Sequence, residues 1–215
     1  QTHNATAHAV ELVGARPVFV DCEPQTGNID VALIEASITP KTKAISLVHF
    51  VGIPCDMDAV VAIAERHGLR VVEDCALALG ARYRGKHVGL IGDAGCFSFY
   101  PVKHITTGDG GMFVTKHQDV AEAISRQRAF GVDRTHSERS VPGFYDVTEL
   151  GFNYRMSEMQ AALGRNQLLK IDPILERRAR NFADLKSIVS SLPDVHVLDS
   201  VDDAVVSSHY CLTVV

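Results

Sequence analysis

The chain has 215 residues, of which 46% are hydrophobic and 22% are charged, a composition typical of a folded globular protein. This length excludes a peptide hormone or a disulfide-stapled toxin, because it suffices for one large domain or for one domain and part of another. The formal net charge is −5 and the 21 lysines and arginines are scattered, so there is no basic stripe of the kind that binds nucleic acid. We therefore expect small-molecule partners.

The charge-free stretches and the cysteines bear on the cellular compartment. Neither of the longest charge-free stretches, Ala44–Cys55 and Ala204–Val215, is long enough to cross a bilayer, and the start of the chain lacks a signal-peptide pattern. The five cysteines are odd in number and widely spaced, which argues against a disulfide framework and against a zinc knuckle. We predict a cytoplasmic protein, with no membrane contact, whose thiols are reduced and mostly buried.

Up to Gly80 the sequence alternates helical and strand patterns. The expected helices are Ala7–Gly14, Asp30–Ile38 and a stretch that starts behind the cap candidate Asp56 and ends at Gly68. The expected buried strands are Pro17–Asp21, Ala44–His49 and Leu69–Glu73. Strands that alternate with short helices predict βαβ units, and hence an α/β fold whose largely parallel sheet has helices on both faces.

After Gly80 the pattern changes to short β segments separated by glycine-containing turns such as Gly108–Gly111, which are typical of ligand loops. The expected strands are Ala81–Tyr83, Ala94–Tyr100 and Gly111–Thr115. The expected helices are Asp119–Phe130, a helix from the capping box at Ser157 to about Ile171, and a charged helix from Pro173 to about Ser191. A long polar loop is expected at Gly131–Tyr145.

The two ends favour an internal piece of a longer protein. The chain opens at Gln1 without an initiator methionine, already inside a helix-and-strand unit, and it closes on the apolar run Tyr210–Val215. We expect a partial large domain over residues 1–171. Residues 172–215 are expected to form a connecting helix and the truncated start, with strands in Val195–Val215, of a small C-terminal α+β domain.

Asp74 directly follows the strand Leu69–Glu73, at its carboxyl end. In a parallel α/β sheet ligands gather at these ends, so a polar residue there is a candidate site residue. Taken alone, Asp74 is better explained as a cap on the following helical turn than as a site residue, because aspartate is favoured at caps.

Ser98 and Lys103 lie in the run Phe97–His104, where an apolar strand leads into a proline and then a lysine. Most lysines are solvated surface residues, and an isolated one is rarely catalytic. Beside a strand-end carboxylate, a small hydroxyl and a glycine-rich turn, however, Lys103 has what a Schiff-base lysine requires. Such a lysine needs a partly desolvated site that lowers its pKa and neighbours that hold a cofactor.

Segments that carry these candidates occur in a recognisable order and spacing. They are Val72–Ala76, Gly92–Phe99, Pro101–Lys103, Gly108–Gly111 and Gly151–Ser157. In this order they closely resemble the DegT/DnrJ/StrS family of pyridoxal-phosphate-dependent sugar aminotransferases, which have fold type I. The resemblance extends from Gln1 to about Ile171, including Thr26–Asp30 and His49–Pro54, and weakens beyond. Each segment alone is a weak motif, but five in order make a chance match improbable.

The resemblance implies a role for five residues. Lys103 would bind pyridoxal phosphate covalently, and Asp74 would pair with the pyridine nitrogen, because an anionic carboxylate keeps this nitrogen protonated and the ring an electron sink. Ser98 would donate a hydrogen bond to the phosphate. Asn153 matches an asparagine that reaches the phosphate of the neighbouring subunit, which implies a homodimer with a shared active site. His3 stands where the family usually has an aromatic residue stacked over the ring.

Two of these assignments have plain structural alternatives. Asn153 also fits a loop or cap residue before the helix at Ser157, and a lone histidine such as His3 is more often solvated. The other nine histidines lack acidic or cysteine partners at metal-ligand spacing, so we assign no metal.

Three features depart from the family pattern. Leu77 replaces a glutamine or histidine that commonly supports the 3-hydroxyl of the ring, so that hydrogen bond is absent or supplied elsewhere. His104 stands where asparagine is frequent. The segment whose backbone amides cradle the phosphate is expected before Gln1, and most of the small domain is expected after Val215.

The resemblance thus implies an enzyme that transfers an amino group, with L-glutamate as the expected donor, to a nucleotide-linked keto-sugar, while Lys103 moves the proton between donor and cofactor. A pyridoxal-phosphate sugar dehydratase ranks low, because its lysine is replaced by histidine. A lyase or desulfurase of the same fold type stays open. So does an inactive, non-catalytic fragment that keeps the sheet and binds no cofactor, which the missing phosphate segment favours.

Overall fold

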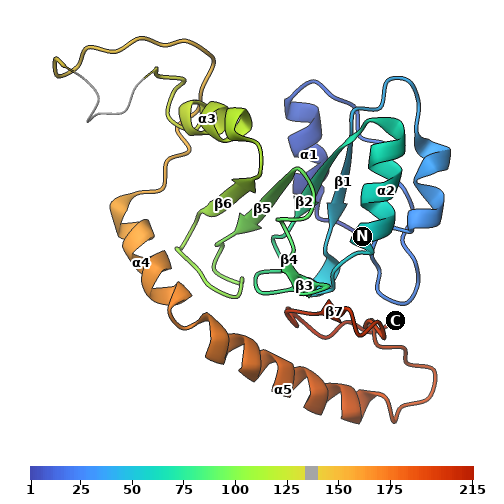
Figure 1. Ribbon diagram of the computed structural model, residues 1–215. Coiled ribbons are helices and arrows are strands. Elements are labelled where there is room, and N and C mark those ends of the chain that lie inside the picture. Colours follow the sequence, from blue (N-terminus) through green and yellow to red (C-terminus); the bar gives the residue numbers. More distant parts are fainter. Residues whose placement is uncertain (134–139) are drawn as a thin grey trace.

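A four-stranded sheet lies at the centre of the computed structural model, which describes residues 1–133 and 140–215 (Figure 1). In spatial order its strands are β1 (Ala44–Val48), β2 (Arg70–Asp74), β5 (Ala94–Ser98) and β6 (Gly111–Thr115). Strands β1, β2 and β5 are parallel, whereas β6 pairs with β5 in the antiparallel direction. The expected α/β fold with a largely parallel sheet is confirmed.

Helix α2 (Met57–His67) joins β1 to β2, and its ends follow from the local sequence. The side chain of Asp56 accepts a hydrogen bond from the backbone N–H of Ala59, and Gly68 ends the helix in the left-handed conformation with a φ of 62°. The apolar residues of α2 recur at helical spacing and pack into one buried cluster with β1 and β2. Burial of each large aliphatic side chain contributes about 1.5–3 kcal/mol. The helix expected between Asp56 and Gly68 is confirmed.

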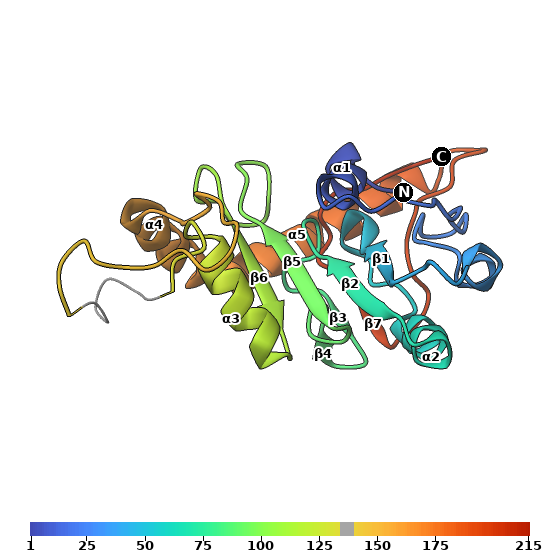
Figure 2. The same cartoon turned by 90° about the horizontal axis from the view of Figure 1, so that it is seen from above.

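Helices cover both faces of the sheet (Figure 2). Helices α2 and α3 (Gln118–Gln127) lie on one face and α1 (Asn4–Leu12) lies on the other, whereas α5 (Ile171–Val189) passes below the ends of the strands in Figure 1. The helices expected at Ala7–Gly14 and Asp119–Phe130 are therefore present, although each starts and ends earlier in the chain. Over the described residues, no helix has both the length and the apolar character needed to span a membrane.

Helix α4 (Glu158–Leu168) begins at the predicted capping box. The hydroxyl oxygen of Ser157 accepts from the backbone N–H of Gln160, whose side-chain oxygen in turn accepts from the backbone N–H of Ser157. Helix α5 starts shortly after α4, so Pro173 lies in the first turn of α5, where its missing N–H costs no helical hydrogen bond. Figure 1 shows α4 and α5 in succession along one side of the molecule.

A second, three-stranded sheet joins the C-terminal part of the chain to its first half. Its order is β4-β3-β7, with β3 (Arg82–Tyr83) antiparallel to both β4 (Lys86–His87) and β7 (Val205–Val206). Within the stretch Val195–Val215, the structure has β7 and a single bridge between Val197 and Val214.

The segment after β7 lies against the loop that follows β1. The backbone N–H of Ser208 donates to the carbonyl of Gly52 over 3.0 Å, and the N–H of Tyr210 donates to the carbonyl of Val51 over 3.1 Å. The hydroxyl of Ser208 donates to the carbonyl of Leu77, in the loop after β2. The C-terminal segment therefore reaches the two loops at the carboxyl ends of β1 and β2.

Two elements expected near the N-terminus differ from the structure. Pro17–Asp21 is not a buried strand: it forms no strand within the described chain, and Val18 and Phe19 are 66% and 71% exposed. An apolar run becomes a sheet strand only where a neighbouring strand can pair with it. Asp30–Ile38 is not one helix but two short 3₁₀ turns, η1 (Val31–Leu33) and η2 (Glu35–Ser37), the form common in such short connecting pieces.

The expected loop at Gly131–Tyr145 lies partly outside the described residues, because 134–139 are not among them. In the described parts of this stretch, regular backbone pairing is limited to Val132, which forms an isolated β-bridge with Val147 beyond the stretch. The loop prediction is confirmed for these parts.

Candidate active site

The carboxyl ends of two neighbouring strands bring Asp74 and Ser98 to one edge of the sheet. Asp74 is the last residue of β2 and lies opposite Cys96 of β5, and Ser98 is the last residue of β5. Lys103 follows in the turn that leaves β5. The sheet thus places a carboxylate, a hydroxyl and an amine where α/β proteins bind their ligands.

Hydrogen bonds hold the Lys103 turn to the end of β5. The backbone N–H of Phe99 donates to the carbonyl of Gly110, and the N–H of Thr107 donates to the carbonyl of Phe99. Gly110 has a φ of 142°, and a Cβ there would lie 2.6 Å from Oγ1 of Thr107, so this turn requires glycine. The N–H of Lys103 itself donates to the carbonyl of Tyr100 over 3.0 Å.

The carboxylate of Asp74 is held at both oxygens. Oδ1 accepts from the backbone N–H of Ala76 over 3.0 Å, and Oδ2 accepts from the hydroxyl of Thr6 over 2.8 Å. The contact with Ala76 is the local turn role that the sequence offered as the alternative for this residue. Each carboxylate oxygen can accept a second hydrogen bond, so Asp74 combines the turn role with capacity to bind a ligand.

Lys103 is half-buried beside this carboxylate. Burial lowers the pKa of its ammonium group, and the negative charge of Asp74 partly opposes that shift. The Nζ atom lies 5.3 Å from the centroid of the Tyr210 ring, a cation–π contact. In the described part of the chain, Nζ has no hydrogen bond or ion pair that would occupy its N–H groups.

Ser98 has one local contact and a free proton. Its Oγ accepts from the backbone N–H of Tyr100 over 3.3 Å. Because a hydroxyl can accept and donate at the same time, its proton stays available to an anion placed at the end of β5.

His104 links the Lys103 turn to the C-terminal segment. Its Nε2 donates to the carbonyl of Ser208 over 3.0 Å, which requires the proton on Nε2, since a carbonyl only accepts. Its buried Nδ1 has no partner among the described residues. Burial lowers the pKa of His104 to about 4, so the ring is neutral at pH 7. The backbone carbonyl of Leu77 also contacts the C-terminal segment, because it accepts from the hydroxyl of Ser208, whereas the apolar side chain of Leu77 offers no hydrogen bond.

In the described chain, the side chains of His3 and Asn153 make no contact with this group, although the backbone carbonyl of His3 accepts from the N–H of Thr6, the residue bonded to Asp74. His3 is exposed at the start of α1, where its Nδ1 accepts from the backbone N–H of Ala5 over 3.1 Å. Asn153 is exposed and pairs with Ala129 as an isolated bridge. No hydrogen bond, ion pair or ring contact within residues 1–133 and 140–215 links either of them to Lys103.

Sequence reasoning missed Thr6, Tyr210 and Arg178. Thr6 follows His3 by one helical turn, a spacing that could have indicated it, because residues three apart share a helix face. The Tyr210 ring contacts both Lys103 and Arg178, and Nη1 of Arg178 donates to the carbonyl of Tyr210 over 2.8 Å. No local pattern predicts these contacts, because they depend on how the C-terminal segment returns to the sheet.

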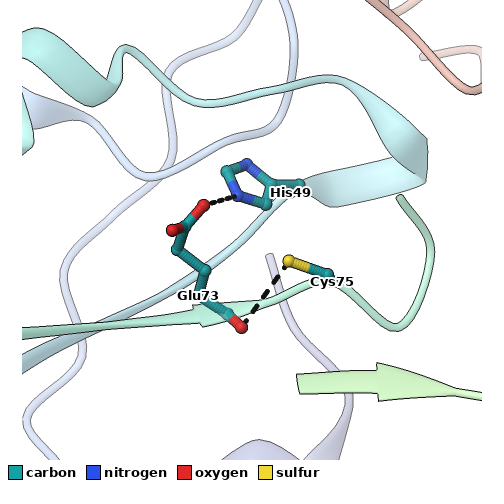
Figure 3. A group of neighbouring side chains, drawn as sticks. All are labelled: His49, Glu73 and Cys75. Atoms are coloured by element: carbon teal, nitrogen blue, oxygen red, sulfur yellow. Dashed lines mark hydrogen bonds and ion pairs between the residues drawn. The ribbon is translucent and has the colours of Figure 1, made fainter. Parts of the chain in front are cut away.

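Next to Asp74, a buried polar cluster joins His49, Glu73 and Cys75 (Figure 3). Nε2 of His49 lies 3.0 Å from Oε2 of Glu73, and Nδ1 of His49 accepts from the backbone N–H of Cys55. The proton of His49 is therefore on Nε2 and is donated to Glu73. The Cys75 thiol points toward the carbonyl of Glu73.

Three backbone N–H groups complete the environment of Glu73: those of Gly89 on Oε2 and of Ile91 and Gly92 on Oε1. Burial pushes the pKa of Glu73 up, but these hydrogen bonds and that of His49 outweigh it and leave the pKa below its usual range. Glu73 is thus an anion that ties the loop before β5 to β2.

The ligand atoms of His49, Glu73 and Cys75 lie within 4.8 Å of one another, close enough to consider a metal site. However, the lone pair of His49 already accepts from Cys55, and both oxygens of Glu73 are engaged. Burial also raises the pKa of the Cys75 thiol, which disfavours the thiolate that a metal requires. We interpret the cluster as structural.

Comparison with known proteins decides the family. The model of the DegT/DnrJ/EryC1/StrS aminotransferase family matches residues 1–215. The chain belongs to this family. Among its relatives, the GDP-perosamine synthase of Caulobacter vibrioides is 46% identical over 179 residues, which cover 83% of this chain and 46% of that protein. The UDP-N-acetyl-3-dehydro-alpha-D-glucosamine 3-aminotransferase of Acidithiobacillus ferrooxidans is 47% identical over 165 residues, 76% of this chain and 42% of that protein.

Solved structures of family members have the same architecture. DesV of S. venezuelae, in complex with a ketimine intermediate, matches with a TM-score of 0.91 and 37% identity over 100% of this chain and 55% of its own. Helicobacter pylori PseC, an aminotransferase of pseudaminic acid biosynthesis, matches with a TM-score of 0.91 and 30% identity over 99% of this chain and 56% of its own. The chain thus spans about half the length of the relatives it matches.

The family uses pyridoxal phosphate, and the residues at the strand ends fit this cofactor. Asp74 has an unfilled acceptor position for a ring N–H, and Lys103 has an amine whose N–H groups are not engaged within the described residues. Ser98 has a hydroxyl proton for a phosphate oxygen. The unfilled capacities of the three side chains therefore match the nitrogen, the aldehyde and the phosphate of the cofactor.

Proposed function

We propose that this chain supplies the cofactor-binding part of a pyridoxal-phosphate-dependent aminotransferase that acts on a nucleotide-linked keto-sugar, with L-glutamate as donor. The observation that carries the proposal is the meeting of Asp74, Ser98 and Lys103 at the carboxyl edge of the sheet, in a chain of the sugar aminotransferase family. Relatives named as nucleotide-sugar aminotransferases and synthases support the substrate class.

The cofactor, when bound, supplies an electron sink for negative charge at the carbon that loses or gains a proton. The side chains of this chain do the rest. The Asp74 carboxylate accepts a hydrogen bond from the ring nitrogen, and the Ser98 hydroxyl donates one to the phosphate. The Lys103 amine would hold the cofactor through its aldehyde, and the same amine would move a proton at the α-carbon of the donor.

The environment of Lys103 suits both of its tasks. A nucleophile and a proton acceptor must be a neutral amine, and burial lowers the pKa of Lys103 in that direction. In the net reaction, the donor would leave as a 2-oxo acid whose new oxygen comes from water, and its amino group would replace the carbonyl oxygen of the keto-sugar, which leaves as water. Lys103 would move the proton in both halves of the exchange.

We further propose a homodimer in which Asn153 reaches the phosphate in the partner subunit and His3 stacks over the ring of the cofactor. The exposure of both side chains supports these roles, since neither is engaged at the strand ends of its own chain. The division into a large domain over residues 1–171 and the start of a small domain over residues 172–215 is part of the same proposal.

The test uses the full-length protein that contains this chain, loaded with pyridoxal phosphate and given ¹⁵N-labelled L-glutamate and a nucleotide-linked keto-sugar. The expected result is release of 2-oxoglutarate with transfer of ¹⁵N to the sugar nucleotide, detected by mass spectrometry. Loss of water from the sugar without nitrogen transfer, or turnover of amino acids alone, would instead support a dehydratase or a lyase and contradict the proposal.

A further inference from the structure

The hydroxyl group of Thr6 has no part in the roles assigned so far. We propose that Thr6, oriented by Thr2, is a positioning residue that holds the Asp74 carboxylate in the orientation in which it meets the ring nitrogen of the cofactor. This inference rests on the proposed function, because it acts through the contact between Asp74 and the ring.

The contact joins two distant parts of the chain. Oγ1 of Thr6 lies 2.8 Å from Oδ2 of Asp74, although the residues are 68 positions apart in sequence. Thr6 lies in the first turn of α1, and Asp74 ends β2, so the bond ties a helix start to the edge of the sheet. Threonine is a poor helix former, and its branched side chain restricts rotation about χ1. Its contribution at this position is therefore a hydroxyl group with a restricted direction.

The direction of the hydrogen bond follows from its acceptor. Oγ1 of Thr2 donates to Oγ1 of Thr6 over 2.7 Å. The Asp74 carboxylate can only accept, so Thr6 gives it its single proton and accepts from Thr2. The Thr2 hydroxyl lies closer to Thr6 than to its second acceptor, the carbonyl of His3 at 3.2 Å. Hydrogen bonds in such a chain polarise and strengthen one another. Thr2 therefore orients Thr6, and Thr6 orients Asp74.

The Asp74 side chain has two torsions, about Cα–Cβ and about Cβ–Cγ, that the backbone does not fix. Strand pairing holds its backbone, since the N–H of His49 donates to the carbonyl of Asp74 over 3.1 Å. The torsion that turns the carboxylate about the Cβ–Cγ bond has a broad energy profile. Ala76 alone would hold one oxygen and let the group pivot, whereas Ala76 and Thr6 together hold both oxygens.

The test compares two cofactor ligands in the full-length protein. Pyridoxal phosphate has the ring nitrogen, and its 1-deaza analogue has a C–H in that place, so only the first can use the Asp74 contact. Dissociation constants for both are measured with the wild type, with Thr6→Val and Thr6→Ala, and with Thr6→Ser, which keeps the hydroxyl.

Removal of the Thr6 hydroxyl is expected to weaken pyridoxal phosphate binding by roughly tenfold, the effect of one hydrogen bond to a charged group. Binding of the deaza analogue should stay unchanged, and Thr6→Ser should bind both ligands as the wild type does. Equal loss of both ligands in Thr6→Val and Thr6→Ala would show that Thr6 only supports the fold, and unchanged binding of both would also overturn the proposal.

Asp74→Asn separates this inference from the proposed function. If the wild type itself binds the two ligands equally well and Asp74→Asn changes nothing, the Asp74 role in the proposed function fails, and with it the role of Thr6. If Asp74→Asn removes a preference for pyridoxal phosphate that Thr6→Val leaves intact, the proposed function stands and the positioning role of Thr6 is wrong.

Discussion

Asp74 shows at the residue scale how a local role and a distant one meet in a single side chain. Its turn contact with Ala76 follows from the sequence alone, and its contact with Thr6 follows only from the fold. Asp74→Asn leaves the size of the side chain unchanged but removes the charge that keeps the ring nitrogen protonated. We expect turnover in the amino-transfer assay to fall at least ~100-fold with the cofactor still bound. Near-normal turnover would leave Asp74 with the turn role only.

His104 makes stability depend on pH. Its pKa is about 4 in the folded chain and near the ordinary value of 6.5 in the unfolded chain, so the unfolded state takes up the proton first as the pH falls. The stabilisation by neutral His104 is therefore complete above pH 6.5 and is lost progressively between pH 6.5 and about pH 4. Burial of His209 shifts its pKa in the same direction and adds to the effect.

Urea denaturation of the wild type and of His104→Asn at pH 7.5 and pH 5 measures the His104 contribution. The wild type should lose more stability between the two pH values than the variant does, because asparagine can donate to Ser208 without titrating. An equal loss in both proteins would contradict the assignment of a buried neutral imidazole.

At the scale of elements, the sequence predicts best where a local signal and the tertiary fold agree. Helix α2 has its cap at Asp56 and its stop at Gly68, and the strand that follows starts and ends one residue later than the predicted Leu69–Glu73. The same strand-end rule places Asp74 near Ser98. The strand prediction for Pro17–Asp21 is wrong because a strand needs a neighbouring strand to pair with, and the residues of this segment carry no information about such a neighbour. Thr6 and Tyr210 were missed for a similar reason, since their contacts exist only after distant elements pack.

The buried Glu73 cluster gives a prediction about these elements. Glu73→Gln puts an N–H₂ group where one carboxylate oxygen accepts hydrogen bonds, so at least one backbone N–H between Gly89 and Gly92 loses its acceptor. We expect the free energy of unfolding to fall by about 3 kcal/mol in urea denaturation.

Glu35→Gln is the matched control, because Glu35 is exposed and pairs with Arg66 at the surface. Its cost should be much smaller than that of Glu73→Gln, because solvent screens a surface ion pair. A Glu73→Gln protein as stable as this control would contradict the structural role of the cluster. A full-length protein that loses a bound metal on this substitution would contradict it as well.

At the scale of the whole molecule, the neighbourhood of Asn153 favours contact with a second copy. Leu150, Phe152 and Tyr154 are exposed apolar or aromatic side chains on the same stretch of chain. If a site takes Lys103 from one subunit and Asn153 from its partner, two inactive variants can complement each other. In a hybrid dimer of Lys103→Ala and Asn153→Ala subunits, one of the two sites keeps both residues.

Mixing the two variants under conditions that exchange full-length subunits should therefore restore about a quarter of wild-type turnover, since half of the dimers are hybrids with one intact site each. Each variant treated in the same way by itself serves as the control. Activity that stays at the sum of the separate variants, with hybrid dimers demonstrated by mass spectrometry, would contradict the shared site.

Lys103 is proposed as the residue that binds the cofactor, and covalent trapping measures this attachment. The full-length protein is loaded with pyridoxal phosphate and reduced with borohydride, which makes the link between lysine and cofactor permanent, and the label is located by peptide mapping. We expect a single label on Lys103 and none in Lys103→Ala. A label on another lysine, or no label in a protein shown to bind the cofactor, would contradict it.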